Sequence, residues 1–193
     1  MGYRISYILA NIPADDLATS LGMIIGETVP EMPDRGPWTA RQNNGWSVLW
    51  SEDELFGLDN EALLRALSKR VLVLYGIINE TVMASTLWAY QGGRKIWEVH
   101  WQGDEGSVPE NLSFDGDLPE IFNDLRAQTD RRYQENPEED YFMLPIDIAA
   151  HYSDFIYDSI LRTEAVDAFR MLQPSGAIAK KSGFLSRLLG GKK

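Results

Sequence analysis

The sequence predicts a single α+β domain with a mainly antiparallel sheet, helices packed on one face of the sheet, and a helical C-terminal section. Segments in which apolar and polar residues alternate recur through the first hundred residues, as expected for half-buried strands. Two sequences between such segments have the composition of tight hairpin turns, which join antiparallel neighbours. Segments with leucines at helical spacing separate the groups of strands.

Length and composition fit one domain over residues 1–174. A chain of 193 residues with 44% hydrophobic content can bury a substantial core. The absence of cysteine excludes disulfides, thiolate catalysis and zinc–cysteine sites. We find neither a secretory signal peptide nor an apolar run of about 18 residues, so we expect a soluble, cytoplasmic protein.

The first half begins with a strand over Tyr3–Ala10, where alternate residues are apolar. Pro13 and the acidic pair after it favour a short helix that Gly22 ends. Further strands are predicted over Met23–Val29, Trp38–Gln42 and Trp46–Trp50, with Asn43-Asn44-Gly45 as a hairpin turn. A helix opening at Leu58-Asp59 is predicted to run to about Arg70.

The segment from Val71 to Trp101 has the strongest strand character in the chain. Gln91-Gly92-Gly93-Arg94 predicts a tight hairpin, because paired glycines supply positive φ angles. Beyond this turn, Trp97, Val99 and Trp101 fall on one face of a strand. The predicted element order up to here is β-α-β-β-β-α-β-β-β.

The remainder is predicted to be mainly helical. Residues 103–117 are acidic and rich in turn formers, which indicates a loop, and helices follow from Pro119 to about Glu135 and over Pro145–Tyr152. A last helix is predicted from Thr163, with Val166, Phe169 and Leu172 as its apolar stripe and Pro174 as its end.

The charge is unevenly distributed along the chain. The 18 Lys and Arg include five after Pro174, whereas all 29 Asp and Glu precede it, so residues 1–174 carry a net charge of −16. Residues 175–193 form a basic amphipathic tail that could be a solvated tether, dock on a protein or contact a membrane surface. The tail residues that we expect to make such a contact are Lys180, Lys181, Phe184, Leu185, Arg187, Leu188 and Leu189.

Two residues are candidates for acid–base chemistry. Glu80 lies between apolar residues, and His100 shares a strand face with Glu98, so either could meet a partner in the fold. The alternative for Glu80 is a carboxylate at a turn or strand edge. The six tryptophans could line a groove, but most are expected in the core.

No cofactor or metal site is expected. Asp147, His151, Asp154 and Asp158 would form one stripe only if a single helix ran through them, and the same spacing suits a solvated helix face. No phosphate-binding loop, nucleophile elbow or dinucleotide fingerprint is present.

We therefore expect a non-catalytic binding protein whose acidic surface engages a basic protein partner, as a toxin-neutralising immunity-type protein or an assembly component would. The net charge of −11 disfavours nucleic acid as a partner. The alternatives are a small hydrolase or lyase that uses Glu80 and His100, and a peripheral membrane adaptor anchored by its tail. The sequence does not indicate an oligomeric state.

Overall fold

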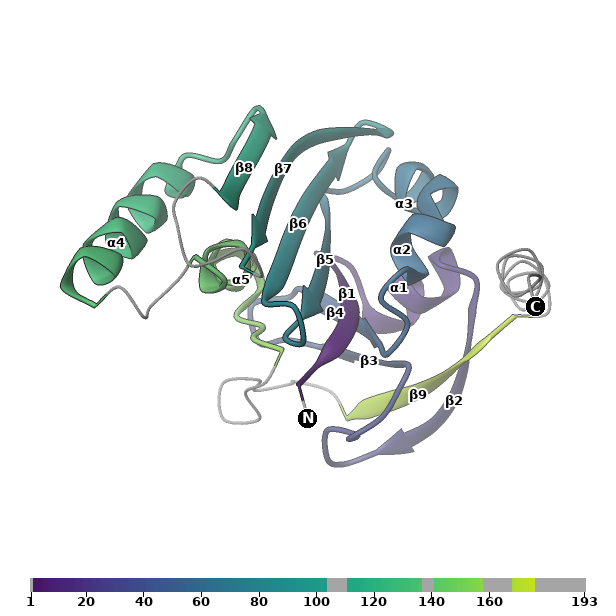
Figure 1. Cartoon of the computed structure of the whole chain (residues 1–193). Helices are drawn as coiled ribbons and strands as arrows, with labels where there is room; N and C mark the ends of the chain where they lie inside the picture. The colour runs from purple at the N-terminus through teal and green to yellow at the C-terminus, as the bar shows by residue number, and fades with distance from the viewer. Residues whose placement is uncertain (1, 104–110, 137–140, 158–167, 176–193) are drawn as a thin grey trace, which may run out of the picture.

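The computed structural model describes residues 2–103, 111–136, 141–157 and 168–175 and has an α+β fold (Figure 1). Its described residues form one antiparallel sheet of nine strands and five helices, which confirms the predicted fold class. None of the described helices has the length and apolar character needed to span a membrane.

The central strand of the sheet is β1 (Arg4–Ala10), which pairs with β4 on one side and β5 on the other. The order across the sheet is β2-β9-β3-β4-β1-β5-β6-β7-β8. The other strands are β2 (Met23–Val29), β3 (Trp38–Arg41), β4 (Ser47–Ser51), β5 (Val73–Asn79), β6 (Ala84–Gln91), β7 (Arg94–Gln102), β8 (Leu112–Gly116) and β9 (Phe169–Pro174).

Both predicted hairpins are present, each at a turn between segments in which apolar and polar residues alternate. Gly45 lies between β3 and β4 with φ +87°, and Gly92 and Gly93 join β6 to β7 with φ +63° and +82°. Only glycine adopts such angles without strain, so local sequence was enough to predict both turns.

Helices cover both faces of the sheet, and the expectation that they pack on one face was wrong. One face packs against α1 (Ala14–Ser20), α2 (Phe56–Asp59) and α3 (Glu61–Leu67), and the other against α4 (Ile121–Glu135) and α5 (Met143–Ser153) (Figure 1). The reason lies in β1, where neighbouring residues such as Leu9 and Ile8 are both fully buried, one in each core.

The second predicted helix of the chain is divided in two. Asn60, with φ −116°, separates α2 from α3, and its side-chain amide donates to the carbonyl of Phe56 at 2.8 Å. Asp59, which was expected to cap one continuous helix, is instead the last residue of α2.

The C-terminal section departs most from the prediction. Residues Phe169–Pro174, expected at the end of a helix, form β9 between β2 and β3. Residues Leu112–Gly116, expected in a loop, form β8 at the edge beside β7. In both cases backbone hydrogen bonds to a partner strand, distant in sequence for β9 and nearby for β8, override the local propensity.

Candidate functional site

The strongest candidate for a binding surface is the loop between β4 and α2. It carries Glu52, Asp53 and Glu54 in succession, and together with Arg4 and Leu55 it lines a cleft of about 450 Å³, here called the acidic cleft. Glu52 and Asp53 are exposed. The lining thus presents three carboxylates and one guanidinium, so its potential is negative.

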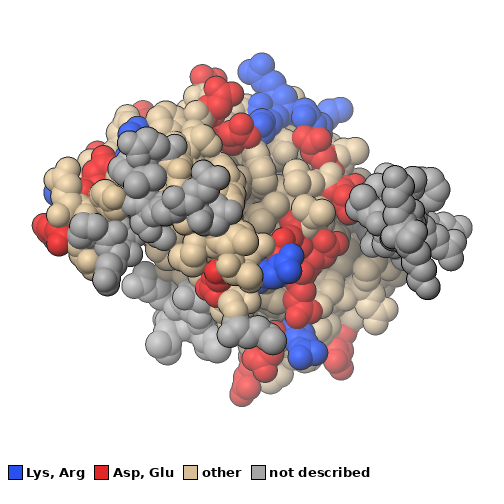
Figure 2. Space-filling model, viewed as in Figure 1, with Lys and Arg blue, Asp and Glu red and all other residues tan. Residues whose placement is uncertain are grey.

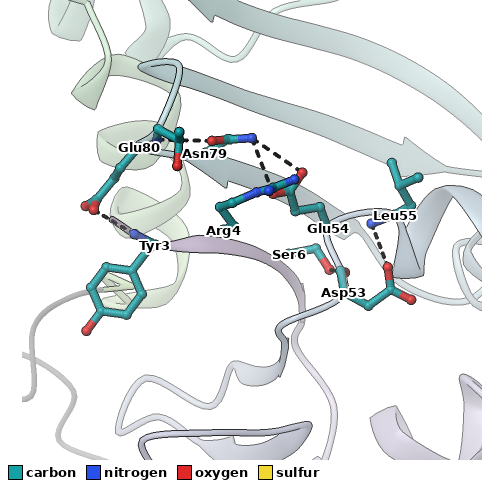
Figure 3. A network of polar contacts seen from close by, with 9 residues as sticks. Tyr3, Arg4, Ser6, Asp53, Glu54, Leu55, Asn79 and Glu80 are labelled. Atoms are coloured by element: carbon teal, nitrogen blue, oxygen red, sulfur yellow. Dashed lines mark hydrogen bonds and ion pairs between the residues drawn. The ribbon is translucent and has the colours of Figure 1, made fainter. Parts of the chain in front are cut away.

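Hydrogen bonds hold the backbone of this loop in place (Figure 3). Ser6 in β1 donates its hydroxyl to the carbonyl of Asp53 at 2.7 Å, and the Asp53 carboxylate accepts the backbone N–H of Leu55 at 3.0 Å. Tyr75 in β5 donates its hydroxyl to the carbonyl of Glu54 at 2.9 Å. Two central strands therefore hold the backbone of the loop that carries the carboxylates.

The single basic residue of the cleft is already paired. The Nε of Arg4 donates to Oε1 of Glu54, and Asn79 donates its amide to the same oxygen at 3.3 Å. This hydrogen bond from Arg4 to Glu54 raises the pKa of the Arg4 guanidinium. Because Arg4 neutralises Glu54, the carboxylates of Glu52 and Asp53 are the charges that face outward.

One apolar side chain, that of Leu55, lines the cleft with these carboxylates. Leu55 is 52% exposed, and Leu58 in α2 is 42% exposed. An exposed leucine beside acidic residues can contact the aliphatic stem of a lysine or arginine whose charged end meets a carboxylate. Figure 2 shows acidic side chains gathered across the middle and lower part of one face of the molecule, with few basic ones among them.

Glu80 occupies the turn that follows β5 and is fixed by two hydrogen bonds. Its Oε2 accepts the backbone N–H of Tyr3 at 2.7 Å, and its Oε1 accepts the hydroxyl of Tyr157 at 2.7 Å. Both carboxylate oxygens are thus engaged in joining the turn to the start of β1 and to the segment after α5. This placement matches a carboxylate at a turn.

His100 lies in β7 on the sheet face that α1 to α3 cover in part. Its Nδ1 is 2.6 Å from Oγ1 of Thr86 on β6, and Glu98 is its neighbour on that face. Burial lowers the pKa of His100, and Glu98 opposes that effect in part. Among the described residues no hydrogen bond or ion pair joins His100 to Glu80, whose partner Tyr157 belongs to the opposite core.

Glu98 has partners of its own. The ammonium of Lys95 donates to its Oε2, and the indole of Trp88 donates to the same oxygen at 2.9 Å. The hydrogen bond from Lys95 lowers the pKa of Glu98. His100 and Glu98 thus belong to a network of cross-strand pairs on the sheet surface.

The tryptophans are mostly core residues, as predicted. Trp38, Trp46, Trp50, Trp97 and Trp101 are buried in the core that faces α4 and α5. Trp88 is half-buried on the other face, stacked on Tyr75 with ring centroids 5.1 Å apart. Neither the acidic cleft nor a second cleft between α4 and α5 is lined by these rings.

The remaining candidate residues, those of a metal site and of the tail, either do not share one helix face or lie outside the described residues. The helix that carries Asp147 and His151 ends at Ser153, and Asp154 has φ +56°, so one unbroken stripe does not form. Within the described ranges no cluster of three metal-ligating side chains occurs. The tail residues Lys180, Lys181, Phe184, Leu185, Arg187, Leu188 and Leu189 lie outside the described residues, as does Asp158.

Reasoning from sequence missed the acidic cleft. The signal was the run Ser51-Glu52-Asp53-Glu54 between two predicted elements, but Arg4 and Asn79 lie 50 and 25 residues from Glu54 along the chain. No protein-family model, curated protein or solved structure matches this chain.

Proposed function

We propose that the protein is a non-catalytic binding protein whose acidic cleft receives a basic segment of a partner protein, as in an immunity-type protein or an assembly component. The observation that carries this proposal is the pair of outward-facing carboxylates, Glu52 and Asp53, on a loop fixed by Ser6 and Tyr75.

The charge distribution supports this proposal. A partner with clustered Lys or Arg would be drawn by the net charge of −16 on residues 1–174 and would then pair with the cleft carboxylates. Exposed Leu55, which lines the cleft, supplies apolar contact beside the charges. Such an arrangement gives a partner both fast association and a defined position.

A pull-down with matched variants tests the proposal. Glu52→Gln with Asp53→Asn removes two charges and keeps an oxygen that can accept the Leu55 N–H. Glu120→Gln with Asp124→Asn makes the same change of charge at the start of α4, where both side chains are exposed. The wild type and both variants are immobilised and exposed to lysate of the source cells at low salt.

We expect the wild type and the α4 control to retain a basic protein. The cleft variant should retain at least about tenfold less of that protein, because two charges at the binding site have been removed. Equal losses in the cleft variant and the α4 control would show that binding reflects net charge alone, and equal retention by all three proteins would show that the cleft carboxylates take no part in it. Retention of no protein by the wild type would contradict the proposed function.

The two alternative functions have less support. A hydrolase or lyase would need Glu80 and His100 at one site, and each has separate partners. A membrane adaptor would depend on the tail, which lies outside the described residues. Both stay predictions from the sequence.

A further inference from the structure

A second cleft lies between α4 and α5, away from the acidic cleft. Its volume is about 570 Å³, within the range of small-molecule sites. α4 contributes Leu125, Gln128, Arg131, Arg132 and Glu135, and α5 contributes Asp147 and His151. Polar side chains from two separate helices therefore converge on one hollow with a leucine in its wall.

The two helices are held in place by contacts outside this cleft. Phe122 of α4 is buried with its ring centroid 5.0 Å from that of Phe114, and the Tyr141 hydroxyl donates to Asp130 at 2.6 Å. Most of α5 is buried against the sheet, including Ile148. Arg131 and His151 are therefore not needed to attach α4 to the rest of the molecule.

The charges of the cleft are only partly paired. Nη2 of Arg132 is 3.3 Å from Oδ2 of Asp147 and 3.1 Å from Oγ1 of Thr129. Arg131, by contrast, has no hydrogen bond or ion pair with any residue that the structure describes, and His151 has only a ring contact with Tyr152. Within the described part of the chain, the nitrogen donors of these two side chains are therefore unpaired at the cleft.

We propose that this cleft binds a small molecule through an anionic oxygen group, a carboxylate or a phosphate, held by the Arg131 guanidinium together with His151. A guanidinium presents donors in a planar fork that matches the paired oxygens of either group. The Arg132–Asp147 pair is already neutralised, so it shapes the wall and leaves Arg131 as the cationic contact.

Glu135 determines what else the ligand must carry. It lines the same cleft without an ion pair to a described residue, so it would repel a bare anion and accept a hydrogen bond from an ammonium or hydroxyl group. The cleft therefore suits a ligand with an anionic group at one end and a donor at the other. This inference is independent of the proposed function.

Titration with inorganic phosphate and with O-phosphoserine, which adds an ammonium group, tests the proposal by isothermal calorimetry at low ionic strength. We expect saturable binding of both, tighter for phosphoserine, and at least about tenfold weaker in Arg131→Gln. Arg94→Gln at the β6–β7 turn is the matched control and should bind as the wild type does. Glu135→Gln should bind phosphate more tightly and lose the preference for phosphoserine.

The proposal fails if neither probe binds saturably. It also fails if Arg131→Gln and Arg94→Gln weaken binding equally, since that would show attraction to overall charge. Because Arg131 and Arg94 have no partners among the described residues, both variants should fold, and circular dichroism checks this.

Discussion

At the scale of single residues, Glu80 shows how a carboxylate can be structural. Its two oxygens accept hydrogen bonds from Tyr3 and Tyr157, which lie far apart in the sequence. Hydrogen bonds to a charged acceptor contribute more to stability than neutral ones. Glu80 therefore adds side-chain hydrogen bonds between the turn after β5, the start of β1 and the segment after α5.

Glu80→Ala tests this role. The variant leaves the Tyr3 N–H and the Tyr157 hydroxyl without this acceptor, so we expect the free energy of unfolding to fall by about 1–2 kcal/mol. Glu52→Ala, which removes an exposed carboxylate, should change it by less than about 0.5 kcal/mol. Urea denaturation measures both, and equal losses would show that Glu80 is not an anchor.

His100 gives a prediction about pH. Burial lowers its pKa in the folded protein below the ordinary value of 6.5. As the pH falls through 6.5, the unfolded chain therefore takes up a proton before the folded protein does, and stability decreases. Above that range both states hold a neutral imidazole, and this contribution no longer changes with pH.

We expect the wild type to lose more stability than His100→Gln between pH 7.5 and pH 5.5. The comparison isolates His100, because the other titrating groups are shared and Glu98, whose pKa is lowered, contributes only at more acidic pH. Urea denaturation across this range is the measurement. Parallel curves for the two proteins would refute the assignment.

At the scale of elements, β5 carries a glycine at a position where it pairs with the central strand β1. Gly76 lies opposite Tyr7 of β1, and a Cβ on Gly76 would be 2.1 Å from the Tyr7 ring. The ring of Tyr7, which is buried, therefore occupies the space above Gly76. A glycine inside a strand marks such a close approach.

Gly76→Ala is expected to lower the free energy of unfolding by about 3 kcal/mol or more, since neither the strand nor the buried ring can move freely. Gly92→Ala is the control, because Gly92 has φ +63° but no atom within 4 Å of its Cβ position. That change should cost about 1 kcal/mol from backbone strain alone. Similar costs for the two variants, measured by thermal unfolding, would contradict this description of the β1–β5 pair.

Predictions from sequence succeeded where an element is specified locally. The Asn-Gly and Gly-Gly turns and the alternation of Trp97, Val99 and Trp101 were enough to identify their hairpins and faces. They failed for β9, because Phe169 and Leu172 suit either a helix or a strand and the deciding partners, β2 and β3, lie more than a hundred residues away. Local periodicity also cannot say on which face of a sheet a helix packs.

At the scale of the whole molecule, charge and topology together produce the candidate site. The negative charge was evident from composition, but the cleft that three of the carboxylates line was not. It depends on β1 and β5 bringing Arg4, Ser6 and Asn79 beside the loop that carries Glu52 to Glu54. Sequence could therefore motivate the proposal of a basic partner but not identify the cleft that is proposed to receive it.

The most direct test of the central claim is a map of amide chemical shifts in the labelled full-length protein, titrated at low salt with a peptide of alternating leucine and lysine. The account predicts saturable shifts at Arg4 and across residues 52–58, and their loss in the variant Glu52→Gln with Asp53→Asn. Shifts that spread over the acidic residues of the whole surface, or that persist at residues 52–58 in this variant, would contradict it.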